Sequence, residues 1–186
     1  MKKLILACLI TLMLTPYSFA KEVAGVNLNE SMKLDSQSLV LNGAGIREKF
    51  FVNVYACGLY TSAKTTNAAQ IINDDKPMAI QLVITTGLVS KEKMQKAMIE
   101  GFENSTNGKM AALQSKIDQF NKCFSDEIVK KDNFIISYIP KTGVQVKKNG
   151  VLKGTIQGLD FKKAVFGIWL GDKPADDDLK DDLLDN

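Results

Sequence analysis

Histidine is absent from this 186-residue chain, and its absence removes a large class of chemistry. Without it there is no Ser-His or Cys-His nucleophile pair, no imidazole base and no imidazole metal ligand. The sequence also lacks a Cys-x-x-Cys pair, a P-loop, a Gly-x-Gly-x-x-Gly fingerprint and an EF-hand loop. We therefore expect no metal and no cofactor.

Clusters of charge are few, and none has the form of an ion site. The acidic stretch Asp176–Asp182 lacks the glycine and the spaced glutamate of a calcium loop, which favours a solvated, partly helical end over a cation site. Basic pairs are scattered along the chain, and we expect them on turns and solvent faces: Lys130-Lys131, Lys147-Lys148 and Lys162-Lys163.

Only the N-terminus carries a long apolar run. Lys2 and Lys3 precede apolar residues 4–14, and Ser18-Phe19-Ala20 ends in small residues, which is the order of a secretory signal peptide cleaved after Ala20. The run is shorter than the roughly 20 residues that span a bilayer, and the alternative is a buried N-terminal helix. Basic and apolar regions of this kind are typical of bacterial signal peptides, so we expect residues 1–20 to direct the protein to the periplasm.

Residues 21–186 then form one domain with an acidic C-terminal tail over 172–186. Loss of two lysines leaves 22 basic against 21 acidic residues, a net charge of +1. That balance gives no overall argument for nucleic acid or an anionic membrane surface, and no further segment is apolar enough to be transmembrane. The oligomeric state stays open.

Cysteine is also scarce. Cys8 lies in the signal peptide, which leaves Cys57 in a strand pattern and Cys123 at the end of a helix pattern. An oxidising compartment permits a disulfide, but a chain of this length needs no such cross-link. Free buried cysteines are the favoured interpretation.

Periodicity and turn residues predict an α+β fold. Strands come in clusters with helices between the clusters, which favours an antiparallel sheet with helices on one face. Ser90 and Asp160 are expected helix caps, and Asn107-Gly108 is an expected break. The expected strands are 23–28, 38–41, 50–60, 79–85, 134–139, 144–147 and 151–156, and the expected helices are 66–73, 90–106, 110–124 and 160–170.

The stretch 41–62, LNGAGIREKFFVNVYACGLYTS, combines a buried-strand composition with polar groups. Strand alternation places Tyr55 on a mixed polar and apolar face, as expected for a cavity wall, and Tyr60 on the opposite face. Gly43 and Gly45 allow close backbone approach or a sharp bend. Arg47 with a tyrosine hydroxyl suits a carboxylate, whereas the alternative is an exposed hairpin tip over residues 47–49.

The segments NGAGIR and KFFVNVYACGLY resemble the glycine-arginine and strand signature of the chalcone isomerase superfamily. The similarity continues through AIQLVITTGLVSKEKM, FIISYIPKTGVQV and LDFKKAVFGIWLG, in order over nearly all of residues 21–186, and the ending FGIWLGDKP is similar to secreted bacterial members. The resemblance implies an open-faced β-sandwich, a large antiparallel sheet with a layer of helices on one face, and a ligand cleft between sheet and helices. It also implies either chalcone cyclisation or fatty-acid binding, in which an arginine and a strand tyrosine hold the carboxylate.

The resemblance matches Arg47 to the family arginine and Tyr55 to the tyrosine of the fatty-acid binders. Met94 and Gly101 stand where the isomerases carry a tyrosine and an asparagine, so the resemblance implies no catalytic residue here. The eight residues from Arg47 to Tyr55 would span roughly 26 Å on one straight strand, so a hairpin must fold Arg47 back. If the hairpin does not fold Arg47 back, Lys49 and Tyr60 are the residues expected to take its place. Met94 and Met98 are expected to line an adaptable apolar cavity.

Three functions follow as hypotheses. The first is a non-catalytic periplasmic protein that binds a small apolar or amphipathic ligand such as a fatty acid. The second is an isomerase, an intramolecular lyase of the chalcone isomerase type. The third is a structural protein whose cleft is filled by its own large side chains: Phe51, Phe102 and Trp169.

Overall fold

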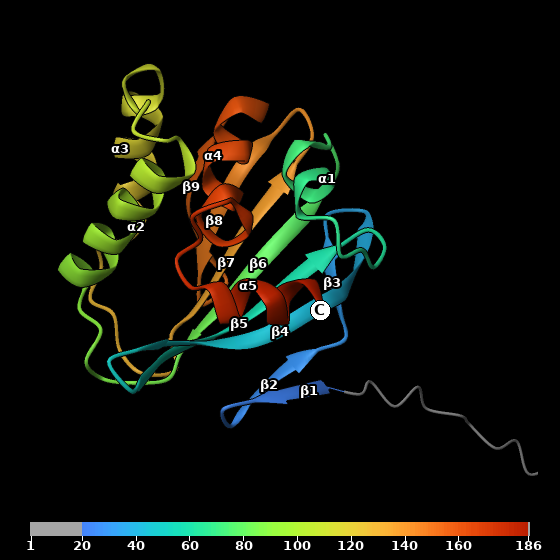
Figure 1. Ribbon diagram of the computed structural model, residues 1–186, viewed down its shortest axis with the longest axis vertical. Helices are drawn as coiled ribbons and strands as arrows, with labels where there is room; N and C mark the ends of the chain where they lie inside the picture. The colour runs from blue at the N-terminus through green and yellow to red at the C-terminus, as the bar shows by residue number, and fades with distance from the viewer. Residues whose placement is uncertain (1–19, 186) are drawn as a thin grey trace, which may run out of the picture.

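A seven-stranded antiparallel sheet runs through the computed structural model, which describes residues 20–185 (Figure 1). The strands lie in chain order: β3 (Ser31–Leu34), β4 (Gln37–Lys49), β5 (Val52–Thr61), β6 (Met78–Ile84), β7 (Asn133–Ile139), β8 (Gly143–Lys148) and β9 (Val151–Ile156). A separate hairpin precedes them: β1 (Ala20–Val23) and β2 (Val26–Asn29). The expected signal peptide, except for Ala20, lies outside the described residues.

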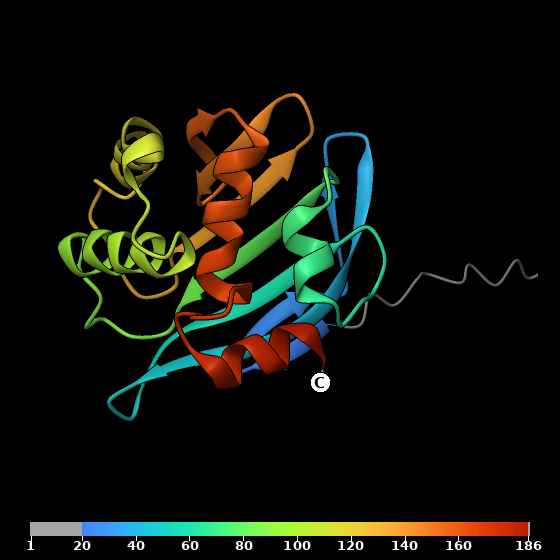
Figure 2. The same cartoon turned by 45° about the horizontal axis from the view of Figure 1, so that its top comes forward.

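The helices lie on one face of the sheet, as Figures 1 and 2 show, which confirms the α+β open-faced architecture. They are α1 (Ala68–Asn73), α2 (Lys91–Ser105), the 3₁₀ turn η1 (Ala111–Leu113), α3 (Gln114–Lys122), α4 (Leu159–Leu170) and α5 (Asp177–Leu184). Within residues 20–185, no helix combines the length and the apolar character needed to cross a membrane.

Local sequence signals explain the start of α2 and the first turn of α4. The Ser90 hydroxyl accepts a hydrogen bond from the Lys93 backbone N–H and caps α2, as expected. The expectation for Asp160 was wrong by two residues, because Gly158 occupies the cap of α4. Asp160 instead lies in the first turn, where a carboxylate complements the helix dipole and pairs with Lys116 at 2.8 Å.

The hairpin that contains the candidate site turns at Phe50 and Phe51 rather than in the glycine segment. Residues 43–48 continue β4, and the two phenylalanines form the turn with φ values of 52° and 61°. Val54 is an extra residue in β5, since Arg47 pairs with Tyr55 while Glu48 pairs with Asn53. Such a bulge re-aims the side chains on either side of it.

Gly43 and Gly45 serve the close approach of α5 to β4. A Cβ at Gly43 would overlap the backbone of Asp182 and Leu183, and one at Gly45 would overlap the Asp182 side chain. Asn42 donates a hydrogen bond to the Leu183 carbonyl at 2.8 Å, which ties the same helix down. The acidic tail is therefore a packed helix with three buried leucines: Leu179, Leu183 and Leu184.

Two apolar cores lie on the two faces of the sheet. Beneath the helices, Phe102 packs against Phe120 and Phe161, with ring centroids 5.5 and 5.6 Å apart. The opposite face is covered in part by the β1–β2 hairpin, where the Tyr60 hydroxyl donates to the Asn29 carbonyl at 3.0 Å. The helix-side core therefore fills much of the space between the layers.

A lysine and two cysteine thiols are also buried in the interior. Lys162, expected on a solvent face, is fully buried, and its ammonium donates to the carbonyls of Ile71, Ile72 and Asp74 at the end of α1. Cys57 and Cys123 are free thiols and both are buried. Burial raises the pKa of the Cys57 thiol, which keeps it protonated and unreactive.

Candidate functional site

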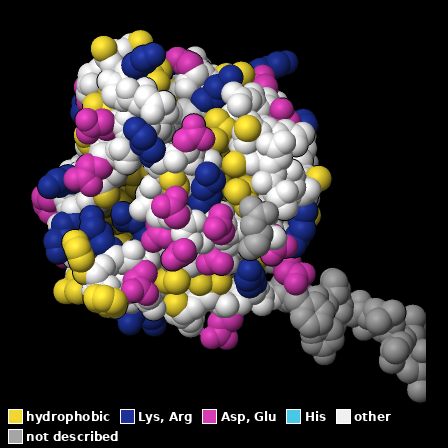
Figure 3. Space-filling view, in the orientation of Figure 1, with side chains coloured by type: hydrophobic (Ala, Val, Ile, Leu, Met, Phe, Trp, Pro, Cys, Tyr) yellow, Lys and Arg dark blue, Asp and Glu magenta, His cyan; other side chains and the backbone are white. Residues whose placement is uncertain are grey.

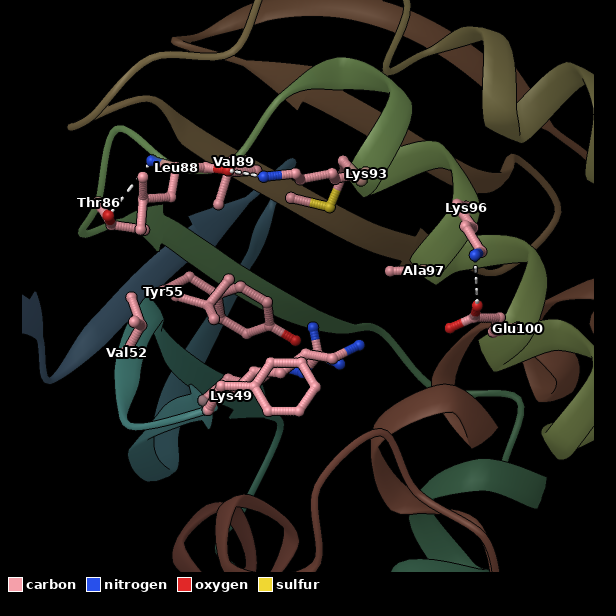
Figure 4. A pocket seen from close by; sticks show the side chains of 14 residues that line it. Lys49, Val52, Tyr55, Thr86, Leu88, Val89, Lys93, Lys96, Ala97 and Glu100 are labelled. Carbon is pink, nitrogen blue, oxygen red and sulfur yellow. Dashed lines mark hydrogen bonds and ion pairs between the residues drawn. The ribbon is translucent and has the colours of Figure 1, made fainter.

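A pocket of about 400 Å³ opens between the end of the β4–β5 hairpin and the first turns of α2 (Figure 4). Its volume lies within the range of roughly 300–1,000 Å³ that small-molecule sites occupy. The lining combines apolar residues with several cations: Arg47, Lys49, Phe50, Val52, Val54, Tyr55, Thr86, Leu88, Val89, Lys93, Met94, Lys96, Ala97 and Glu100.

Arg47 and Tyr55 stand directly opposite each other on β4 and β5. The guanidinium carbon lies 5.7 Å from the centre of the tyrosine ring, which is cation–π distance. The hairpin turn at residues 50–51 thus brings together two side chains that one straight strand would hold far apart. A single small anionic group can contact both.

The Arg47 guanidinium has unused hydrogen-bonding capacity. Its Nε is buried, and within residues 20–185 it has no hydrogen-bond acceptor. None of the ion pairs found in that part of the chain involves Arg47. A buried N–H of a charged group costs about 1–3 kcal/mol or more when left unpaired, so an acceptor that reached this group would be favourable.

Tyr55 is the polar group at the floor of the pocket, and only 2% of its surface is exposed. Its hydroxyl accepts a hydrogen bond from Nε1 of Trp169 in α4 at 3.0 Å. Burial raises the pKa of this hydroxyl well above its usual value, and the Arg47 charge opposes that shift only in part. Tyr55 therefore stays protonated, with its own proton available for donation.

The first half of α2 forms the facing wall. Met94 is buried and Ala97 is half-buried, and both present apolar surface to the pocket. Lys93 and Lys96 lie on the rim above them, as Figure 4 shows. The Lys93 ammonium donates to the Leu88 carbonyl at 2.8 Å, and Lys96 pairs with Glu100 at 3.8 Å.

The structure brings four of the six residues expected in the site into one pocket: Arg47, Lys49, Tyr55 and Met94. Tyr60 points to the opposite face of the sheet, where its hydroxyl is 3.0 Å from Asn29 and 3.1 Å from Gln81. Met98 lies one helical turn beyond Met94 and is buried in the helix-side core, outside the pocket lining. We leave both out of the site.

Gly101, the second helix position singled out by the resemblance, lies away from the pocket. A Cβ at this position would come within 2.7 Å of Ile168, so the glycine permits the close packing of α2 against α4. The large side chains expected to close the cleft behave differently from one another. Phe102 and Trp169 do fill its interior, whereas Phe51 is 98% exposed.

Sequence reasoning missed Trp169 as a partner of Tyr55 and missed the lysines of α2. Trp169 is 114 positions from Tyr55, and no local pattern joins them. Lys93 and Lys96 lie three apart beside Met94 and Ala97, so helical spacing alone would have placed them on the same face.

Comparison with known proteins agrees with this architecture. Residues 20–185 match the family model described as chalcone isomerase-like. No curated protein matches the chain. Among solved structures, the Arabidopsis thaliana fatty-acid binding protein AtFAP1 superposes with a TM-score of 0.69 at 19% identity, covering 88% of this chain and 93% of that one. At that identity the likeness shows a shared fold. Because the family model spans all of the described residues, this chain belongs to the chalcone isomerase-like family.

Proposed function

We propose that this protein is a non-catalytic binding protein for a small amphipathic ligand with an anionic end, such as a fatty acid. The anionic group would lie between Arg47 and Tyr55, and the apolar tail would lie along Val54, Val89 and Met94 toward the mouth of the pocket. The solved relative AtFAP1 is described as a fatty-acid binding protein, which supports the same ligand class here.

The buried, unpaired Nε of Arg47 carries this proposal. A carboxylate placed beside the guanidinium accepts two parallel hydrogen bonds, which are stronger than bonds between neutral groups. The Tyr55 proton supplies a further donor on the same side. Protein groups already arranged for an anion lose little entropy on binding it.

The tail supplies affinity. Each methylene removed from water contributes about 0.8 kcal/mol, which corresponds to roughly a fourfold change in Kd. Affinity should rise with chain length until the pocket of about 400 Å³ is full, and additional methylenes should then add little.

Two features favour binding over catalysis. Tyr55 is a proton donor held protonated by burial, so it is not a general base. Met94, which the resemblance aligns with a catalytic tyrosine, presents an apolar thioether to the pocket. The isomerase hypothesis therefore lacks the polar groups on α2 that the family resemblance assigns to it.

We also propose that the protein acts after export, with residues 1–20 removed as a signal peptide. A ligand of this kind is poorly soluble in water, and a soluble carrier suits a compartment that lies between membranes. N-terminal sequencing of the protein recovered from the cell envelope tests this: a first residue of Lys21 supports it, and an intact Met1 contradicts it.

The function is tested by isothermal titration of delipidated protein with saturated fatty acids and with the matching primary alcohols. The alcohol keeps the tail and loses the charge, so it isolates the contribution of the anionic end. We expect Arg47→Gln to weaken binding of the acid by about tenfold or more, since hydrogen bonds to charged groups contribute about 1.5–3 kcal/mol. Binding of the alcohol should change far less.

The wild-type comparison decides between the hypotheses. Tighter binding of the acid than of the alcohol, lost in Arg47→Gln, supports the proposal. Equal affinity for acid and alcohol contradicts the role of Arg47. No binding of either, together with no lipid extracted from the purified protein, contradicts ligand binding at this pocket.

A further inference from the structure

The β4–β5 hairpin ends in two adjacent phenylalanines that face solvent. Phe50 is 85% exposed and Phe51 is 98% exposed, and Leu88 on the neighbouring β6–α2 loop is 63% exposed. Figures 1 and 2 show that this turn projects beyond the sheet on the same side as that loop. Phe50 and Leu88 also line the mouth of the pocket. We call these three residues the apolar tip.

The turn itself does not require aromatic residues. Both phenylalanines have positive φ, at 52° and 61°, in a two-residue hairpin turn. Asn-Gly is the usual choice for that geometry, and this chain uses it at Asn149 and Gly150, where φ is 50° and 83°. Large side chains thus occupy strained positions, whereas the β8–β9 hairpin has Asn and Gly at the equivalent positions. Such strain is a reason to look for a function.

Positive charge surrounds the apolar tip. The pocket lining contains four cations, Arg47, Lys49, Lys93 and Lys96, against one carboxylate, Glu100, which already pairs with Lys96. Two further carboxylates lie nearby in the chain: Glu48, and Glu92 beside Lys91 at 3.9 Å. Figure 3 shows hydrophobic side chains gathered at the hairpin tip beside a group of Lys and Arg side chains. The nearly neutral chain therefore has a locally basic, apolar end.

We propose that the apolar tip docks on a lipid bilayer that contains anionic phospholipid, with the mouth of the pocket against the membrane. Aromatic and leucine side chains enter the boundary between headgroups and acyl chains, while lysines at the same end attract anionic headgroups. Lys49, whose ammonium is 5.8 Å from the Phe50 ring, is placed at that boundary.

The shape of the apolar tip favours a bilayer over a protein partner. It is a narrow projection of three side chains, whereas a stable protein interface buries about 800 Å² per partner over a broad patch. A projection that carries apolar groups at its end and cations behind them fits a deformable, negatively charged surface. It fits a flat protein surface less well.

This docking deepens the proposed function, because it would let a ligand pass between bilayer and pocket without crossing water. Only the transfer of a ligand between bilayer and pocket rests on the proposed function. Binding of the empty protein to vesicles requires neither Arg47 nor a ligand, so the two proposals can fail separately.

The test is co-sedimentation of delipidated protein, begun at Lys21, with vesicles of phosphatidylcholine alone and of phosphatidylcholine with one quarter phosphatidylglycerol. We expect binding to the anionic vesicles that weakens as salt rises. The double variant Phe50→Asn/Phe51→Gly, which keeps a standard turn, should lower the partition coefficient by about tenfold or more, because even one fully buried phenylalanine contributes that much.

Leu152→Asn is the matched control, since Leu152 is 50% exposed on the edge strand β9, four strands across the sheet from β5. It should bind vesicles as the wild type does. Failure of the wild type to sediment with anionic vesicles overturns the proposal, and so does equal binding by the double variant. A wild-type dimer in solution that the double variant abolishes, without vesicle binding, would show a protein interface instead and would also overturn it.

Discussion

The hydroxyl of Tyr55 accepts a hydrogen bond from the indole N–H of Trp169 at 3.0 Å, while the Arg47 guanidinium lies over the same ring. Trp169 comes from α4 and Arg47 from β4, so one side chain links the helical layer to the sheet. The indole fixes the hydroxyl and leaves its proton free to point toward the pocket. The polar end of the pocket is thus set by contacts between the two layers rather than within one strand.

Tyr55→Phe should separate the contribution of the hydroxyl from that of the aromatic ring. The ring and its packing remain, but the Trp169 N–H loses its acceptor and the pocket loses a donor. We expect the free energy of unfolding to fall by about 1–3 kcal/mol, measured by urea denaturation. Fatty-acid affinity should fall by roughly tenfold, because a hydrogen bond to the carboxylate is lost.

Tyr60→Phe is the control for that experiment. Its hydroxyl also bonds within the protein, to Asn29 and Gln81, but on the opposite face of the sheet. A loss of stability with unchanged fatty-acid affinity is expected. If Tyr60→Phe weakened fatty-acid binding as much as Tyr55→Phe does, the placement of the ligand beside Tyr55 would be wrong.

Local patterns were enough to predict most of the elements. Strand β9 begins directly after the Asn149-Gly150 hairpin signal and has the predicted bounds 151–156, and Ser90 caps α2 as its position before the apolar stripe predicts. These signals depend on neighbouring residues alone. Of the two roles predicted for Gly43 and Gly45, the structure has close backbone approach and no sharp bend, and the sequence could not decide between them because the approaching helix α5 is distant in the chain.

Gly43→Ala tests that explanation. The new Cβ would overlap the backbone of Asp182 and Leu183, which cannot move without lifting α5 from β4. We expect the free energy of unfolding to fall by about 1–3 kcal/mol, as for other overpacked sites, and proteolysis within α5 to become faster. Gly87→Ala is the control, since a Cβ there meets nothing within 4 Å, and it should leave both measurements unchanged.

The geometry of the site was less accessible to sequence reasoning than the fold. A bulge at Val54 puts Val54 and Tyr55, adjacent in the chain, on the wall of one pocket, which strict alternation forbids. The position of the bulge depends on how β4 and β5 pair, and no residue type in β5 predicts it. The turn at Phe50 and Phe51 could not be predicted from the sequence either, because phenylalanine is disfavoured at positive φ.

Stability should fall in acid through Asp132, a 5% exposed carboxylate before β7. Desolvation acts to raise its pKa, but hydrogen bonds from Val129 and Asn149 and the Lys148 ammonium at 2.9 Å prevail and lower it. A native carboxyl with a lowered pKa stabilises the fold above its unfolded pKa of about 3.9. That contribution is lost as the pH falls through the folded value.

Asp132→Asn should therefore be less stable than the wild type at pH 7 and should lose less stability as the pH falls from 5 to 3. Urea denaturation at each pH gives both quantities. A variant whose stability falls in parallel with that of the wild type over this range would show that Asp132 is not responsible for the acid sensitivity.

The strain at the hairpin tip predicts a gain in stability when its aromatic residues are removed. A non-glycine residue in the left-handed region costs about 1–2 kcal/mol, and Phe50 and Phe51 occupy that region in succession. Phe50→Asn/Phe51→Gly gives the turn the pair that the β8–β9 hairpin already uses, so we expect the free energy of unfolding to rise by about 1–2 kcal/mol. Gly150→Ala provides the reverse test. The φ of Gly150 is 83° and a Cβ there meets nothing within 4 Å, so only backbone strain should lower the stability of this variant, by about 1 kcal/mol. Opposite shifts in thermal midpoint for the two variants would show that the chain retains Phe50 and Phe51 at a cost to folding. A loss of stability in the double variant would mean instead that the phenylalanines pack usefully against the rest of the molecule, which their exposure argues against.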